Sequence, residues 1–292
     1  MKPAPFKYER PLSIEEALEL LSNSDGDVKL LAGGQSLVPA MNFRIMQPSV
    51  LIDLNRVEGL DYLEQTEEGG LRIGAMTRQA AVEKHPMVAE SAPLLNQAMP
   101  LIAHPQIRNR GTIGGSMVHA DPAAELPVVA VAVGAEFTIQ GQTGERTLSA
   151  EEFFQGMFTT AVGPDELLVE VHFPPNPEKT GWSFQEIARR HGDYAMAGIA
   201  AGVTLDAKGD CKSARLVYLN VGDGPVEAVE SARILIGHED SGELFEEVAH
   251  HVTDHVVFPF GNVHATPEYQ SHLARVLTVR ALSEAWQRAG QR

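Results

Sequence analysis

Two short glycine-rich stretches hold the residues of this sequence that are best suited to contact a ligand. The first is Ala32-Gly33-Gly34-Gln35-Ser36 and the second is Thr112-Ile113-Gly114-Gly115-Ser116. Glycine adopts positive φ at little cost and lets the backbone approach another group closely. Successive N–H groups in such a turn can form an anion-binding concavity, to which a serine hydroxyl adds a donor. Gly-Gly pairs also occur in ordinary turns, but two such loops in one sequence favour a long diphosphate ligand held at two places.

Two further stretches carry side chains that could contact the same ligand. Asp121 and Glu125 follow the second loop, and either carboxylate could accept hydrogen bonds from ribose hydroxyls. Alternatively, Asp121 caps the following helix and Pro122 is its first residue. The run Arg189-Arg190-His191-Gly192-Asp193-Tyr194 combines arginines, which can stabilise an anion, with a ring that can pack on a planar ligand. Taken alone, Tyr194 could equally be a packing residue.

Other kinds of chemistry lack their motifs. There is no Gly-x-x-x-x-Gly-Lys-Ser/Thr sequence, no Gly-x-Gly-x-x-Gly after a strand and no Gly-x-Ser-x-Gly. His251 and His255 are four residues apart, but the glutamate of a zinc-protease helix is missing, so we expect a solvated helix face there. We therefore predict no catalytic residue and no metal ligand in this chain.

Composition narrows the class of protein and its partners. The net charge of −16 argues against nucleic-acid binding and against anionic membranes. The single cysteine, Cys211, excludes an intrachain disulfide and an iron–sulfur cluster held by this chain's own thiolates. The longest apolar run, Leu126 to Val133, is too short to span a bilayer, and the N-terminus lacks the apolar region of a signal peptide. We expect a cytoplasmic protein without membrane insertion.

The elements that must position these residues follow from hydrophobic periodicity and capping signals. Strands are predicted over 28–31, 50–54, 71–75, 135–139, 165–173, 198–206 and 215–221. Helices are predicted after Ser13, over 36–42 as a helix or turn, after Thr77, over 92–103 and 126–133, after Ser149, and from Thr266 onwards. Pro174-Pro175-Asn176-Pro177 is the clearest linker. The pattern indicates a mixed α/β protein.

The two loops, the Ala120-Asp121-Pro122-Ala123 sequel and the Arg189–Tyr194 run together resemble a known family. It is the FAD-binding medium subunit of the molybdenum hydroxylases, of the carbon monoxide dehydrogenase medium-chain type within the xanthine oxidase family. The resemblance covers nearly the whole chain in order.

The resemblance implies an α+β fold. A two-subdomain FAD-binding fold of the vanillyl-alcohol oxidase (PCMH) type, with subdomains over 1–57 and 58–175, is followed by a C-terminal α+β domain over 178–292. In the family the two loops hold the FAD pyrophosphate. The Asp121–Glu125 stretch reaches the ribose and adenine end, and Leu168 and the Arg189–Tyr194 run lie near the isoalloxazine. The implied cofactor-binding residues are Ala32, Gly33, Gly34, Gln35, Ser36, Leu37, Thr112, Ile113, Gly114, Gly115, Ser116, Asp121, Glu125, Leu168, Arg189 and Tyr194.

The function implied is that of an electron-transfer subunit. A large partner subunit carries the molybdenum cofactor and hydroxylates the substrate, and a small partner subunit carries two [2Fe–2S] clusters. FAD in this chain collects the electrons and passes them to an external acceptor. Two alternatives are a free-standing FAD oxidase of the same fold and a flavin-free subunit that only assembles a complex.

Two departures from the family pattern bear on the substrate. Members that act on carbon monoxide tend to have histidine in place of Gln35, and asparagine is common in place of Ser116. The Gln-Ser form is more similar to subunits of enzymes that hydroxylate N-heterocycles. The resemblance therefore favours an N-heterocycle over carbon monoxide as the substrate of the holoenzyme.

Overall fold

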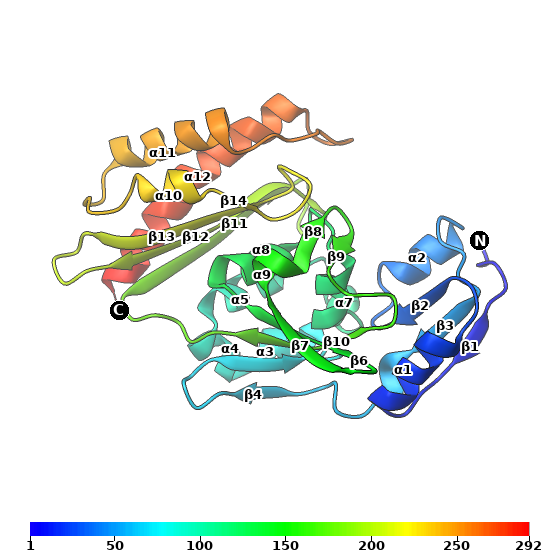
Figure 1. The fold of residues 1–292 in the computed structure, drawn as a ribbon. Coiled ribbons are helices and arrows are strands. Elements are labelled where there is room, and N and C mark those ends of the chain that lie inside the picture. Colours follow the sequence, from blue (N-terminus) through cyan, green and yellow to red (C-terminus); the bar gives the residue numbers. More distant parts are fainter. Residues whose placement is uncertain (292) are drawn as a thin grey trace.

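The computed structural model describes residues 1–291, and its main sheets follow one another along the chain (Figure 1). The first segment is a small parallel sheet in the strand order β1-β3-β2. Its elements are β1 (Lys7–Glu9), α1 (Ile14–Asn23), β2 (Val28–Leu31), α2 (Leu37–Asn42), β3 (Val50–Asp53) and the 3-10 helix η1 (Leu54–Arg56). As predicted, the Ser13 hydroxyl caps α1 by accepting from the Glu16 N–H. The first glycine loop joins β2 directly to α2.

The middle segment is built on an antiparallel sheet in the order β4-β5-β10-β6-β7. Its elements are β4 (Leu63–Gln65), β5 (Leu71–Gly74), α3 (Gln79–Lys84), α4 (Pro86–Ser91), α5 (Pro93–Ala98), η2 (Met99–Leu101), α6 (Pro105–Arg108), α7 (Ile113–His119), α8 (Glu125–Val133), β6 (Glu136–Gly141), β7 (Gly144–Ser149), α9 (Ala150–Phe153), β8 (Phe154–Gly156), β9 (Thr159–Thr160) and β10 (Leu167–Phe173). Helix α8 is buried over almost its whole length, as its continuous apolar sequence predicts.

The third segment is an antiparallel sheet in the order β11-β12-β13-β14, followed by helices. Its elements are β11 (Thr180–Ala188), β12 (Ala195–Leu205), β13 (Cys211–Leu219), β14 (Val226–Glu227), α10 (Val229–Arg233), α11 (Gly242–His255) and α12 (Pro267–Gly290). Figure 1 shows these helices covering one face of the sheet, while the other face is turned toward α5 and α8 of the middle segment. Among residues 1–291, no helix is both long and apolar enough to cross a lipid bilayer.

Two predicted helices differ from the structure at their ends. Thr77 does not cap a helix, because α3 begins at Gln79 and the Thr77 hydroxyl bonds instead to the backbone of Tyr62, accepting at 3.1 Å and donating at 2.8 Å. The helix predicted over 92–103 is divided into α5 and η2. Pro100 causes the change to 3-10 geometry, since proline cannot donate the hydrogen bond that would continue an α-helix.

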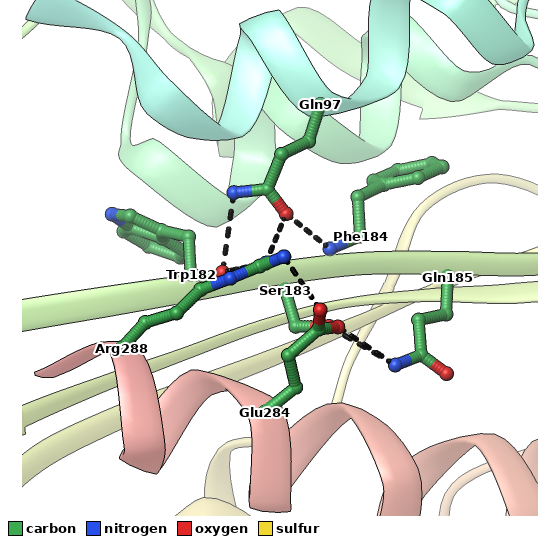
Figure 2. Close-up of polar contacts among 7 residues, drawn as sticks. All are labelled: Gln97, Trp182, Ser183, Phe184, Gln185, Glu284 and Arg288. Carbon is green, nitrogen blue, oxygen red and sulfur yellow. Dashed lines mark hydrogen bonds and ion pairs between the residues drawn. The ribbon is translucent and has the colours of Figure 1, made fainter. Parts of the chain in front are cut away.

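A polar network joins the middle segment to the third (Figure 2). The Gln97 Oε1 on α5 accepts from the Phe184 N–H at 3.1 Å and from the Arg288 guanidinium at 2.6 Å. The Gln97 Nε2 and the same guanidinium both donate to the Trp182 carbonyl. On α12, Glu284 pairs with Arg288. One amide thus connects α5, the edge strand β11 and the final helix.

We predict that Gln97→Leu lowers the free energy of unfolding by about 1–3 kcal/mol, because it leaves donors of Phe184 and Arg288 without their acceptor at the interface. Chemical denaturation followed by circular dichroism measures the change. The exposed substitution Gln106→Leu is the control and should change stability by less than about 0.5 kcal/mol. Equal stability of the two variants would contradict the role given to the network.

Candidate functional site

The structure brings the two glycine loops into direct contact. A Cβ on Gly33 would lie 2.4 Å from the carbonyl oxygen of Arg110 and 2.7 Å from the Cα of Gly111. A Cβ on Gly115 would lie 3.3 Å from the Cβ of Ala32. Real Cβ atoms do not approach a backbone atom at the first two distances, so only glycine fits at position 33. The predicted pair of loops therefore forms one surface, built from the first and the middle segments.

The first loop presents unused backbone donors. Within residues 1–291, the N–H groups of Gly33 to Ser36 have no hydrogen-bond acceptor. Gly34 has a φ of +73°, which glycine adopts without strain. The Gln35 side chain donates from Nε2 to the carbonyl of Gly33 at 2.9 Å and so stabilises the turn. Consecutive free N–H groups of this kind form a concavity suited to an oxyanion.

The second loop is arranged differently. Its glycines lie in α7 and do not have positive φ, so the expectation that this pair needs left-handed backbone is wrong. The Gly114 N–H donates to the Ala75 carbonyl at 2.8 Å, and the Gly115 N–H donates to the Thr112 hydroxyl at 3.1 Å. A Cβ on Gly114 would lie 2.5 Å from that of Ala75. Here glycine is required by close packing, and the partly exposed Ser116 is the polar side chain of this loop.

The stretch after the second loop holds two carboxyl groups. Helix α8 begins at Glu125 with Ala124 as its N-cap, so the alternative in which Asp121 caps this helix is wrong. Asp121 instead accepts from the Ala123 N–H at 2.9 Å and stabilises the preceding turn. The Glu125 side chain is buried, with 8% of the residue exposed. The Pro122 carbonyl accepts from the backbone N–H that follows β13, at 2.8 Å, which fixes this turn to the third segment.

The Arg189–Tyr194 turn connects β11 to β12 and docks on the middle segment. Gly192 has a φ of +87°, and a Cβ there would lie 2.3 Å from the imidazole ring of His104. Both constraints require glycine. The Arg189 side chain is exposed. Leu168, by contrast, is buried in β10 within the core of the middle segment, with 3% exposed.

Tyr194 lies at the end of this turn and is 67% exposed. Partial loss of solvation by neighbouring protein atoms raises the pKa of the Tyr194 hydroxyl, and the negative charges of Asp121 and Glu125 raise it further. Asn220 donates both to the Pro122 carbonyl, at 2.8 Å, and to the Ala195 carbonyl, at 2.6 Å, so the residue after Tyr194 lies beside the residue after Asp121. Residues from two regions that the sequence predicted separately are therefore neighbours.

The sequence reasoning missed Glu186, which lies on β11 opposite Gly198 of β12. Its Oε2 is buried and has no hydrogen-bond partner among the described residues. Burial raises the pKa of Glu186 to about 8, with a smaller contribution from the charge of Glu125. Burial likewise raises the pKa of Glu125 to about 7, to which Asp121 adds. No local motif signals Glu186, because its burial depends on packing between segments.

These shifts predict a specific pH dependence of stability. Between the ordinary glutamate pKa of about 4.5 and about 8, the folded chain holds the Glu186 proton while the unfolded chain has released it. The folded state therefore binds more protons, and stability falls as pH rises through this window. Glu186→Gln should flatten that slope and raise the melting temperature near the upper end of the window. Thermal unfolding of the FAD-free chain across pH tests this, and the exposed Glu145→Gln should leave the slope unchanged.

Comparison with known proteins gives one consistent family. Residues 4–176 match the model for the FAD binding domain in molybdopterin dehydrogenase, and residues 182–285 match that for the CO dehydrogenase flavoprotein C-terminal domain. A curated relative, the 6-hydroxypseudooxynicotine dehydrogenase complex subunit alpha of Paenarthrobacter nicotinovorans, is 43% identical over 99% of this chain and 97% of its own length.

Solved structures agree in fold over the whole chain. Carbon monoxide dehydrogenase from Hydrogenophaga pseudoflava, lacking the Mo-pyranopterin moiety of its cofactor, matches with a TM-score of 0.94 and 36% identity, covering 99% of both chains. Quinoline 2-oxidoreductase from Pseudomonas putida 86 matches with a TM-score of 0.94 and 35% identity, also covering 99% of both chains. The chain belongs to the family of FAD-binding medium subunits of molybdenum hydroxylases.

Proposed function

We propose that FAD binds across the two glycine loops, with its diphosphate against the backbone of Gly33 to Ser36. The observation that carries this assignment is the contact between the loops, in which the N–H groups of the first loop have no acceptor among residues 1–291. Two features of the structure fit the cofactor. Glycine at position 33 lets the two loops pack against each other, and Ser116 adds a hydroxyl from the second loop.

The remaining predicted residues extend the site in two directions. Asp121 and Glu125 are proposed to reach the ribose and adenine end, while the turn that ends at Tyr194 is proposed to lie near the isoalloxazine. Leu168 is buried in β10, so we propose that it supports the site from the core. The exposed ring of Tyr194 is free to pack on a planar ring system.

In the holoenzyme, we propose that this chain relays electrons. FAD supplies redox chemistry that accepts electrons singly or in pairs, and the protein supplies position and electrostatics. The single cysteine, Cys211, is buried in β13, and burial raises its pKa to about 11, so it is an unreactive structural thiol. We propose that electrons arrive from [2Fe–2S] clusters of a small partner subunit, while a large subunit holds the molybdenum cofactor. An external acceptor takes the electrons from FAD.

We propose an N-heterocycle as the substrate of the holoenzyme. Gln35 and Ser116 depart from the pattern of subunits that act on carbon monoxide. One relative is named for a nicotine derivative and one structural neighbour for quinoline, although carbon monoxide dehydrogenase has an equally similar fold. We also propose the domain boundaries 1–57, 58–175 and 178–292, which are supported by one main sheet in each range. A cytoplasmic location is a further proposal.

We predict that Gly33→Ala weakens FAD binding by about tenfold or more, because the new Cβ would push the two loops apart. Flavin content per chain and the Kd for FAD, from fluorescence titration of the FAD-free chain, measure the effect. Gly242→Ala is the matched control, since a Cβ there meets open space. Wild-type flavin content in folded Gly33→Ala would contradict the proposed location of FAD.

The relay is tested anaerobically with candidate N-heterocycles. The purified chain alone should keep its oxidised flavin spectrum when substrate is added, but lose it with a chemical reductant. Co-expressed with the molybdenum and iron–sulfur subunits, the same flavin should be bleached by substrate. Bleaching by substrate without partners would favour the free-standing oxidase, and a chain that binds no flavin would favour the assembly subunit.

A further inference from the structure

A hydrogen-bonded bridge of Asn55 and Arg78 joins the two glycine loops. Asn55 donates from Nδ2 to the carbonyl of Ala32 at 3.0 Å. The Oδ1 of the same amide accepts from Nη2 of Arg78. Nη1 of Arg78 in turn donates to the carbonyl of Arg110. The bridge therefore connects the first residue of the first loop to the backbone two residues before the second loop.

Both ends of the bridge are fixed by their own segments. Asp53, at the end of β3, accepts from the Asn55 N–H at 2.9 Å and from its Nδ2, and it is bonded in turn by the Tyr8 hydroxyl of β1. On the other side, the N–H of Gln79 donates to the Gly111 carbonyl at 2.9 Å. The bridge therefore links the parallel sheet of the first segment to the backbone that leads into α7.

The carboxylates of Asp53 and Asp61 act on the Arg78 guanidinium from a distance but form no ion pair with it. None of the ion pairs among residues 1–291 includes Arg78 or the neighbouring Arg110. Burial lowers the pKa of Arg78, and the positive charge of Arg110 lowers it further. A guanidinium has five N–H donors, and the bridge uses only one from Nη1 and one from Nη2 of Arg78. The remaining donors and the charge suit an anion beside the loops.

We propose that Arg78 is the counter-charge for the FAD diphosphate and that its bridge to Asn55 sets the spacing of the glycine loops around that diphosphate. This inference rests on the proposed position of FAD. Arginine suits the task because its planar fork binds phosphate oxygens with charge-assisted hydrogen bonds while holding other acceptors. The bridge also forms hydrogen bonds to the carbonyl oxygens of Ala32 and Arg110, which reduces the negative charge that the loops present to the phosphates.

The test compares Arg78→Gln, Arg78→Lys and the control Arg56→Gln, which removes the same charge from an exposed position beside Asn55. The FAD-free full chain of each variant is titrated with FAD at several salt concentrations. R78Q should raise the Kd by about 10- to 100-fold and make its salt dependence shallower. R78K should keep the salt dependence but lose part of the affinity, and R56Q should stay within about twofold of wild type.

Each other outcome has a defined meaning. Equal Kd values for R78Q and R56Q would overturn the proposal, as would a weaker Kd with unchanged salt dependence, because the latter indicates a purely structural role. If circular dichroism shows that R78Q is unfolded, the R78K variant provides the test. Wild-type affinity for FAD in R78K would overturn the proposal, because lysine lacks the planar guanidinium that the bridge requires. A wild-type chain without FAD, or full FAD content in Gly33→Ala, would contradict the proposed function or site instead.

Discussion

The close approach of two backbone segments, Gly33 against the Arg110 carbonyl, is the constraint on which the rest of the site depends. Such an approach is possible only without a Cβ. Once the loops touch, the first presents its N–H groups on the remaining open side. The sheet of the first segment and the sheet of the middle segment are thereby held together by backbone contact at the place where the cofactor is proposed to bind.

In the proposed site, the third segment contributes side chains rather than backbone. Glu186 lies on strand β11, and the turn that ends at Tyr194 follows this strand. The network around Gln97 holds β11 on the middle segment (Figure 2). Burying the Glu125 and Glu186 carboxyls costs stability. Burial of ionisable groups at such a cost is common where a protein tunes the protonation of a functional site.

Local signals in the sequence predicted a large part of the fold. The hydroxyls of Ser13, Ser149 and Thr266 cap helices as expected, because a cap depends on residues three positions apart. The glycine loops were also recognisable as a pair. The sequence did not show why each loop needs its glycines. Gly114 packs on Ala75, which follows strand β5 and lies 39 positions earlier in the chain.

Long-range polar contacts were beyond the reach of sequence reasoning. Asn55 and Arg78 are 23 residues apart, and Arg78 and Arg110 are 32 apart, with no motif connecting them. Glu186 was also beyond sequence reasoning, because the elements packed around β11 determine whether this one polar side chain is buried. Strand β11 itself was not predicted. Its register with β12, from Thr180 opposite Thr204 to Ala188 opposite Ala195, identifies it only once the sheet is assembled.

The hydrophobic core that runs between the middle and third segments has a consequence for biosynthesis. Phe184 and Leu219 of the third segment pack in the same cluster as Leu94 and Val128 of the middle segment. The opposite face of that sheet is covered by α12, which ends at Gly290. An emerging chain thus leaves apolar surface of the middle segment uncovered until strands β11 to β13 have been synthesised. Both glycine loops are synthesised before those strands, so the apolar surface of the middle segment is open to aggregation until the third sheet folds onto it.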